Sequence, residues 1–493
     1  MDRQESPLGG SGYGLETRKE PSWTLDQILL ATGGRLVSGE AYRSLVPNAA
    51  GIPCFRSIST DSRTITSGDI FLALSGENFD GLAFTAQAIS LGASGLIVDR
   101  AFSPLPPVPV VLVEDCLRAL GDLAAYRRGQ IKDMKVLAIT GSSGKTTVKD
   151  MTASILGQCG ETLKTKGNFN NLVGLPLSLL PANCLHGFGV LEMGMNAPGE
   201  IARLTEIADP DVACITNVHP AHLAGLGSIE GVARAKGELF AGCREATILA
   251  VNLEDPLIRK MVRGLRQKMI PFGFRREAVV RATRVVGFGQ QGVAFTLNLA
   301  GHTARVRLRV LGRHNVLNAL AAAASAYAVG AGIDQIVSGL EAFSPGTNRL
   351  GLCPLPCGLQ VINDSYNANP SSMNAALATV AMIRKGERTV AVLGDMLELG
   401  AASTEAHTAL GSLVVQYGFD YLCAIGEYAG TVVAAARSAG MTENAAHHCL
   451  DKEEAAAIIH GLLAAGHLQC NDLILVKGSR GMRMEQVIAA LNP

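Results

Sequence analysis

Short apolar runs alternate with amphipathic segments along almost the whole chain. The run at 136–139 (VLAI) is typical of a buried strand, and Val148, Met151 and Ile155 then recur at helical spacing. Three more apolar runs, each ending in glycine, lie at 389–394, 421–426 and 472–478. Strands that alternate with helices in this way predict an α/β fold built on parallel sheets.

The same pattern divides the chain into regions. Residues 1–22 are polar and glycine-rich without the apolar core of a signal peptide, so we expect a disordered extension there. We predict a small α/β domain, a central parallel-sheet domain and a doubly wound domain, at 23–114, 115–341 and 342–493. Residues 281–310 alternate between apolar and polar side chains, which predicts an antiparallel ribbon, and a helix is expected over 314–329.

Composition limits the kinds of partner. The 493 residues carry 43 basic and 43 acidic side chains, so no basic surface for nucleic acid is indicated. The alanine-rich stretch 319–333 is too short and too weakly apolar to cross a bilayer. The eleven cysteines include no CxxC pair, and Cys353 and Cys357 in CPLPC do not have zinc-site spacing. We expect a cytoplasmic monomer that binds neither nucleic acid nor membrane.

The strand at 136–139 leads into a glycine-rich turn that indicates nucleotide binding. The turn consists of Gly141, Ser142, Ser143, Gly144, Lys145, Thr146 and Thr147. Glycines let backbone N–H groups approach phosphate oxygens, and the following helix adds a partial positive charge. Lys145 would reach the β- and γ-phosphates, and the Thr146 hydroxyl would bind Mg²⁺. Only the short GxxGKT form is present, because the longer form needs glycine at Ile139; an ordinary strand–helix turn is the alternative.

Polar residues follow other predicted strands of the central region. Glu192 comes directly after one strand, and His219 and His222 follow the next. At the same sheet edge as the phosphate loop, Glu192 and His222 would suit a metal ion, with an N-cap or a solvated loop position as the alternative. The two histidines lack a third zinc ligand at suitable spacing. Lys236 lies in a helical segment, where an ordinary surface lysine is the default interpretation.

Four further residues are candidates for nucleotide contacts. Asn315 and Asn318 lie three positions apart on one helix face, where their amides would hydrogen-bond a purine edge. Arg349 would contact the γ-phosphate, and Asp364, at the end of a predicted strand, would hold ribose hydroxyls. A helix cap, a surface ion pair or a turn carboxylate is the alternative for each.

Several long motifs in sequence order resemble the Mur ligases, the ATP-dependent amide-bond ligases of peptidoglycan assembly. They are DSR, GDIFLALSGENFDG, TKGNFNNLVGLP, EMGMNAPGEI, NDSYNANPSSM, VLGDMLELG and VKGSRGMRME. The resemblance covers about residues 23–493. It implies a UDP-binding first domain, a P-loop ATPase-like second domain and a Rossmann-like third domain. It also implies ATP and two Mg²⁺ ions, and transfer of D-alanyl-D-alanine to UDP-N-acetylmuramoyl-tripeptide through an acyl phosphate and a tetrahedral intermediate.

The resemblance also implies roles by position. Glu192 and His222 match metal-binding positions, and Lys236 matches a lysine that CO₂ carbamylates into a further metal ligand. Together with Lys145 and Arg349, these residues are implied as catalytic. The phosphate loop, Asn315, Asn318, Arg349 and Asp364 match the ATP contacts. The uridine nucleotide is assigned to Asp61, Ser62, Arg63, Asn78, Phe79 and Asp80. The peptide of the nucleotide sugar is assigned to Asn168, Asn170 and Asn171. The incoming dipeptide is assigned to Asn369, Lys477 and Ser479.

Other activities stay open at this point. The Mur ligase that adds the third amino acid usually carries a DNPR-like motif, which this sequence lacks. Folate polyglutamate ligases share the architecture but not the nucleotide-sugar domain. A P-loop ATPase or kinase acting as a switch would need no such domain either. A catalytically silent Mur-like binding protein is disfavoured by the presence of Lys145, Glu192, Lys236 and Asp364.

Overall fold

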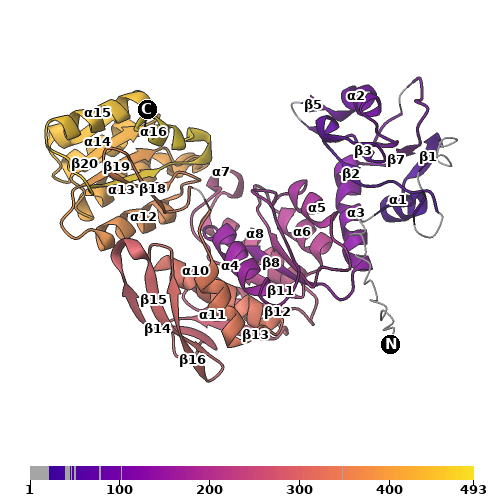
Figure 1. The fold of residues 1–493 in the computed structure, drawn as a ribbon, viewed down its shortest axis with the longest axis horizontal. Coiled ribbons are helices and arrows are strands. Elements are labelled where there is room, and N and C mark those ends of the chain that lie inside the picture. The colour runs from indigo at the N-terminus through magenta and orange to yellow at the C-terminus, as the bar shows by residue number, and fades with distance from the viewer. Residues whose placement is uncertain are drawn as a thin grey trace, which may run out of the picture. The chain divides into compact units, whose positions relative to one another are not determined.

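A computed structural model of the chain describes residues 22–38, 45, 47–48, 52–76, 79–101, 103–346 and 348–492. The predicted extension up to residue 21, and the predicted contact Asn78, lie outside the described residues. The chain forms two compact units (Figure 1). One runs to Arg127 and includes Leu180–Asn183, and the other contains Arg128–Leu179 and the chain from Cys184 onward. No helix in the described part is long and apolar enough to cross a membrane.

The first unit contains a five-stranded sheet in the order β1-β7-β6-β3-β2. Its strands are β1 (Arg35–Ser38), β2 (Ile58–Ser59), β3 (Ile70–Leu72), β6 (Gly95–Val98) and β7 (Val110–Leu112), with a hairpin of β4 (Ser75–Gly76) and β5 (Phe79–Asp80). Its helices are α1 (Leu25–Thr32), α2 (Thr85–Ser90) and α3 (Cys116–Gln130), which ends in the second unit. β1 runs antiparallel to β7, and the other neighbours are parallel.

The second unit contains a nine-stranded sheet in the order β16-β15-β14-β13-β12-β11-β8-β10-β9. Its strands are β8 (Lys135–Thr140), β9 (Thr162–Lys164), β10 (Phe188–Glu192), β11 (Val212–Ile215), β12 (Ile248–Asn252), β13 (Met269–Gly273), β14 (Val280–Gly287), β15 (Val293–Leu299) and β16 (His302–Leu308). The pairings from β9 to β14 are parallel, and β14, β15 and β16 form the predicted antiparallel ribbon.

Among the described residues, eight helices accompany the nine-stranded sheet, whose apolar side chains need cover from water. They are α4 (Lys145–Leu156), α5 (Gly174–Leu179), α6 (Glu200–Ala208), α7 (Leu223–Leu226), α8 (Ile229–Gly242), α9 (Pro256–Met261), α10 (His314–Ala328) and α11 (Ile333–Ala342). Val148, Met151 and Ile155 of α4 are buried in one core cluster with Leu137 and Ile139 of β8, as their spacing predicts. This packing fixes the helix that follows the phosphate loop against its strand.

The second unit also contains a six-stranded sheet in the order β17-β18-β22-β19-β20-β21. Its strands are β17 (Gly351–Pro354), β18 (Gln360–Asp364), β19 (Thr389–Gly394), β20 (Tyr421–Ile425), β21 (Ala446–Cys449) and β22 (Leu473–Lys477). Its helices are α12 (Pro370–Ile383), α13 (Ser403–Gln416), α14 (Ala429–Ser438), α15 (Lys452–Ala464) and α16 (Glu485–Ala490). All neighbours are parallel except β17 and β18.

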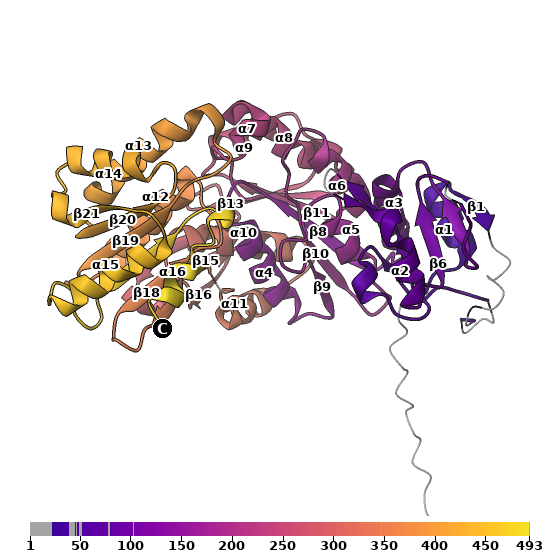
Figure 2. The same ribbon diagram turned by 90° about the horizontal axis from the view of Figure 1, so that it is seen from above.

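This sheet is apolar on both faces. Ala391 and Leu393 of β19 pack in a cluster with α12, α13 and α14, whereas Val390 and Val392 pack in a cluster with α15 and α16. Successive side chains of a strand point to opposite faces, so an unbroken apolar run needs helices on both sides. Figure 2 shows α13 and α14 on one face and α15 and α16 on the other, which confirms the predicted doubly wound fold. The domain boundaries at 114 and 341 stay predictions.

Candidate active site

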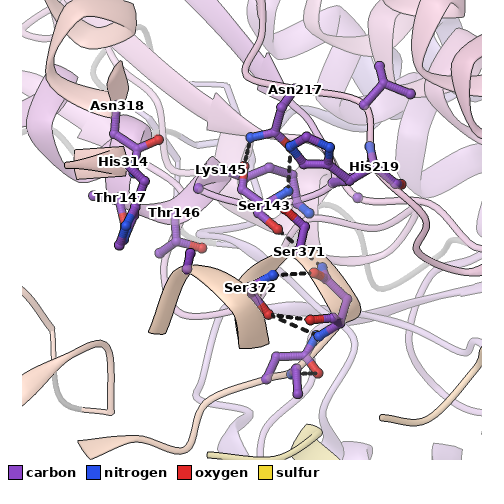
Figure 3. Close-up of a pocket in the computed structure, with 18 of the residues that line it drawn as sticks. Ser143, Lys145, Thr146, Thr147, Asn217, His219, His314, Asn318, Ser371 and Ser372 are labelled. Carbon is purple, nitrogen blue, oxygen red and sulfur yellow. Dashed lines mark hydrogen bonds between the residues drawn. The ribbon is translucent and has the colours of Figure 1, made fainter. Parts of the chain in front are cut away.

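A pocket of about 720 Å³ lies in the second unit, where the phosphate loop faces residues that follow β18 and the last residue of β22. It is lined by polar side chains from both of the unit's sheets. Figure 3 shows Asn217 and His219 on one side of Ser143, and Ser371 and Ser372 of α12 on the other. Carboxyl ends of parallel strands are where ligands bind in open α/β sheets.

The phosphate loop is held by side chains that follow β11. The Ser143 N–H donates to Asn217 Oδ1 at 2.9 Å, and the Thr216 hydroxyl donates to the Ser143 carbonyl at 2.6 Å. Gly141 and Gly144 have φ of +151° and +79°. A Cβ on Gly141 would lie 1.9 Å from Thr216 Oγ1, so no other residue fits there. The loop therefore presents its backbone to the pocket ahead of the 12-residue helix α4.

Lys145 lies inside this loop with its amine turned back onto it. Its Nζ donates to the Gly141 carbonyl at 2.8 Å. Burial lowers the pKa of Lys145, the nearby Glu192 charge opposes that shift, and Arg349 adds to it. A phosphate in the loop would give this amine a stronger acceptor than the carbonyl it now contacts.

Thr146 and Glu192 meet at the centre of the pocket. The Thr146 hydroxyl donates to Glu192 Oε2 at 2.7 Å, and Asn170 Nδ2 donates to Glu192 Oε1 at 2.9 Å. Glu192 is only 2% exposed, so its carboxylate needs these partners. Lys149, which sequence reasoning missed, lies 4.0 Å from Glu192 Oε2 and donates to the Thr165 carbonyl at 3.0 Å.

Two side chains from beyond residue 341 contact the phosphate loop. Arg349 Nη2 donates to Thr146 Oγ1 at 3.0 Å, and Asn369 Nδ2 donates to Ser143 Oγ at 3.1 Å. The Arg349 guanidinium also lies 3.9 Å from the ring centroid of Tyr366, a cation–π geometry. Asn369 doubles as the N-cap of α12, since its Oδ1 accepts from the Ser372 N–H.

Other predicted nucleotide and dipeptide contacts surround this centre. Asp364 accepts from Lys477 Nζ at 2.6 Å, and Lys477 is the buried last residue of β22. Asn318 Nδ2 donates to Asn315 Oδ1, and both amides line the pocket. Ser479 does not line it; its hydroxyl accepts from the Leu397 N–H at 2.8 Å.

His222 and Lys236 are placed differently from each other. His222 lines the pocket, has φ of +54°, and lies with Nδ1 2.6 Å from Glu398 Oε2, which lowers the pKa of Glu398. Lys236 is 1% exposed, and its amine has no hydrogen-bond or ion-pair partner among the described residues. Burial, with the Lys145 charge nearby, puts the pKa of Lys236 well below its ordinary value.

The remaining assignments are divided between the two units. Asn168 and Asn171 line the pocket beside Asn170. In the first unit, Arg63 donates to the Asp61 carboxylate, which lowers the pKa of Asp61 to about 2.

The other first-unit assignments lie on two short elements, Ser62 in a 3-10 helix and Phe79 and Asp80 in β5. Ser62 is buried and donates to Gln87, whereas Phe79 is 55% exposed. Asp80 accepts from Arg100 and Ser75. All the site roles assigned from the sequence stay predictions.

Sequence reasoning also missed several pocket residues. They include Asn217, Asn252, Glu254, His314 and Tyr366. Asn217 and Asn252 carried a usable signal, because Asn217 follows β11, the neighbour of the phosphate-loop strand, and Asn252 ends β12, the next strand of the same sheet. Tyr366 carried none that separates it from an ordinary turn aromatic.

Comparisons with known proteins match successive parts of the chain to one family. Three family models match it: "Mur ligase family, catalytic domain" at 55–128, "Mur ligase middle domain" at 139–326, and "Mur ligase, glutamate ligase domain" at 348–480. The UDP-N-acetylmuramoyl-tripeptide–D-alanyl-D-alanine ligase of Escherichia coli strain K12 is 39% identical over 440 residues, 88% of this chain and 93% of that protein.

Solved structures give the same result. A crystal structure of MurF from Acinetobacter baumannii has a TM-score of 0.86 at 34% identity, covering 96% of this chain and 99% of that one. MurF ligase from Thermotoga maritima in complex with ADP has a TM-score of 0.78 at 27% identity, covering 88% and 96%.

Proposed function

The chain belongs to the Mur ligase family, and from this premise we propose that it is an ATP-dependent ligase that joins D-alanyl-D-alanine to UDP-N-acetylmuramoyl-tripeptide. The E. coli relative named for that activity matches almost the full length of both chains. The observation that carries the proposal is the meeting of a phosphate loop with Arg349 and Asn369 in one pocket. A nucleotide and an incoming amine substrate need such a two-sided site.

ATP is the nucleotide we propose for the phosphate loop. The relative from T. maritima was solved with ADP, and the loop here has the glycine geometry that lets backbone N–H groups reach phosphate. Lys145 and Arg349 would neutralise charge as the γ-phosphoryl group moves. The amides of Asn315 and Asn318 would hydrogen-bond the purine, and Asp364 the ribose.

The reaction that fits these parts has two steps. The terminal carboxylate of the tripeptide attacks the γ-phosphorus of ATP, which forms an acyl phosphate and releases ADP. The amine of D-alanyl-D-alanine then attacks the acyl carbon, and the tetrahedral intermediate loses phosphate to leave an amide. The acyl phosphate is sensitive to water, so contacts such as Asn369 to Ser143 would help to keep solvent out.

We propose that two Mg²⁺ ions complete the site. Thr146 and Glu192 supply oxygen atoms of the kind Mg²⁺ prefers, and His222 lines the same pocket. The ions would supply positive charge beside the phosphate oxygens. Lys236 fits the family's carbamylated lysine, because its buried amine lacks a partner among the described residues and its lowered pKa favours the neutral form that reacts with CO₂.

The remaining contacts are proposed from position. The uridine nucleotide would be held in the first unit by Asp61, Ser62, Arg63 and Asp80, beside Phe79. Asn168, Asn170 and Asn171 would meet the peptide, and the dipeptide would lie near Asn369, Lys477 and Ser479. We also propose that the protein acts as a monomer in the cytoplasm.

Phosphate release tests the function directly. The protein would be mixed with ATP, Mg²⁺ and UDP-N-acetylmuramoyl-tripeptide, with and without D-alanyl-D-alanine. We expect release that requires both substrates, with the pentapeptide product seen by mass. Release that instead follows a UDP-muramoyl dipeptide with lysine or diaminopimelate would make it the ligase for the third residue. Turnover indifferent to every muramoyl substrate would overturn the proposal.

The carbamate has its own test. Lys236→Ala should nearly abolish activity, and added formate or acetate should restore part of it by supplying a carboxylate. In ¹³C-bicarbonate, the wild type should show a carbamate carbon signal by NMR that Lys236→Ala lacks. Full activity in Lys236→Ala, or the same signal in both proteins, would contradict the assignment.

A further inference from the structure

A second cavity of about 400 Å³ lies in the second unit, between the β14–β15 ribbon and the end of α12. None of its lining residues belongs to the pocket described above. Its apolar wall is formed by Phe274, Val285, Met382 and Ile383. Figure 1 shows α12 beside the ribbon at this place. The volume is in the range of ordinary small-molecule sites.

The charged groups of this cavity are all of one sign. Arg284 and Arg313 line it, and no carboxylate does so among the described residues. Neither guanidinium has a hydrogen-bond or ion-pair partner in the described part of the chain. Arg313 lies 5.0 Å from the ring centroid of Phe274, so one cation lies directly on the apolar wall. An anion attached to an apolar group would match both features.

The backbone around Arg284 is irregular. The pairing of β14 with β15 shifts between Thr283 and Val286, which leaves Arg284 in a bulge with φ of +51°. Residues other than glycine rarely adopt a positive φ, and residues that do so concentrate at functional sites. The bulge aims the side chain of Arg284 differently from those of a regular strand.

Two segments connect this cavity with the phosphate-loop pocket. α12 begins at Asn369, which contacts Ser143, and its far end supplies Met382 and Ile383 to the cavity wall. The start of α10 is the second connection, because Arg313 lines the cavity and the adjacent His314 lines the pocket. An occupant of the cavity would therefore contact the same helix that contacts the phosphate loop.

We propose that this cavity binds a small organic anion with an apolar ring system, and that its occupant strengthens nucleotide binding. The occupant would contact both the ribbon and α12, so it would favour the arrangement in which α12 lies on the phosphate loop. Ligands that favour one arrangement raise each other's affinity by the same factor. Binding to the cavity is independent of ligase activity, and only the coupling rests on the proposed function.

A matched pair of fluorescent probes tests the binding. One is 1-anilinonaphthalene-8-sulfonate, and the other is N-phenyl-1-naphthylamine, which has the same rings without the sulfonate. We expect saturable binding of the sulfonate to the full-length protein and at least about tenfold weaker binding of the neutral probe, because charge-assisted contacts are lost. Equal binding of both probes would overturn the proposal, and so would displacement of the sulfonate by sodium sulfate alone at low millimolar concentration.

Variants locate the probe. Arg284→Asn tolerates the positive φ without the guanidinium, Arg313→Gln removes the second cation, and Met382→Glu adds an acid at a side chain that is 62% exposed. Each should weaken sulfonate binding roughly tenfold, whereas Arg276→Gln, outside the cavity, should leave it unchanged. Unchanged binding in the three cavity variants would overturn the site.

Added ADP and Mg²⁺ separate the two proposals. ADP should tighten sulfonate binding, and displacement by ADP would place the probe at the nucleotide pocket and overturn the second site. ADP affinity measured alone by calorimetry keeps the outcomes distinct. Failure to bind ADP would defeat the proposed function and leave the cavity tests standing, whereas normal ADP binding without any effect on the probe would defeat the coupling.

Discussion

Two buried lysines near the phosphate loop differ in what surrounds their amines. Lys149 is 3% exposed and lies between the carboxylates of Glu192 and Asp150, at 4.0 and 3.5 Å. Lys236 is 1% exposed and has no such partner among the described residues. Burial without a carboxylate partner favours the neutral form of an amine, and it lowers the pKa of Lys236. Lys149 therefore supports the site as the ion-pair partner of Glu192, whereas the amine of Lys236 favours the neutral form that reacts with CO₂ in the proposed carbamate.

Lys149→Met should destabilise the protein strongly. It would remove the ion-pair partner that lies 4.0 Å from the buried Glu192 carboxylate, at a cost of about 3 kcal/mol in the free energy of unfolding by denaturant. Lys164→Met is the matched control, since Lys164 pairs with the same Asp150 but is 49% exposed, and should cost less than about 1 kcal/mol. Adding Glu192→Gln to Lys149→Met should recover more than half of the loss. No recovery would mean that Lys149 acts through the Thr165 carbonyl instead.

Lys236→Met should raise thermal stability, and the gain should shrink with pH. The native pKa of Lys236 lies well below 10.5, so between these values the unfolded chain binds a proton that the native protein does not. Stability of the wild type therefore rises with pH by up to about 1.4 kcal/mol per unit from this residue, until pH passes 10.5. Melting temperatures in CO₂-free buffer at pH 7 and 9.5 would show a smaller difference at 9.5. The exposed Lys132→Met should give no such trend.

At the scale of elements, the helices α4 and α6 both begin after a glycine with positive φ, but the space around the two glycines differs. Gly144 precedes α4 with φ of +79°, and Gly199 precedes α6 with φ of +87°. A Cβ on Gly144 would lie 2.5 Å from Asn318 Oδ1, whereas a Cβ on Gly199 would meet nothing within 4 Å. The phosphate loop is therefore packed against α10 at Gly144, in a backbone conformation that glycine adopts without strain.

Gly144→Ala should reduce nucleotide binding, and Gly199→Ala should not. Both substitutions put alanine in the left-handed region, at about 1–2 kcal/mol of strain. Only Gly144→Ala also displaces Asn318, so we expect its KM for ATP to rise at least about tenfold. Equal KM values in the two variants would show that backbone strain, and not the contact with Asn318, limits the loop.

Local patterns predicted the elements better than the contacts between them. The strand–turn–helix at 135–156 follows from apolar spacing and two glycines, and the ribbon from its alternation. Lys149 was invisible, because one lysine on an amphipathic helix looks solvated until its neighbours are known. The meeting of Arg349 with Thr146 joins residues 203 positions apart, and no local pattern contains it.

At the scale of the whole second unit, α12 joins two sheets through its first turn. Asn369 caps α12 with its Oδ1 and donates its Nδ2 to Ser143 of the phosphate loop. The cap stabilises α12, and the hydrogen bond to Ser143 holds α12 against the phosphate loop. Because one side chain does both, only a variant that keeps one of these functions can separate them.

Asn369→Ser and Asn369→Ala provide that separation. Serine caps helices about as well as asparagine but is too short to reach Ser143, so stability should hold while the KM for ATP rises several-fold. Alanine loses both functions, so it should show the same rise in KM and a further loss of about 1 kcal/mol in unfolding free energy. Steady-state kinetics and denaturant unfolding on the same samples give both values. A normal KM in Asn369→Ser would mean that Arg349 alone is enough to hold the third-domain residues over the nucleotide.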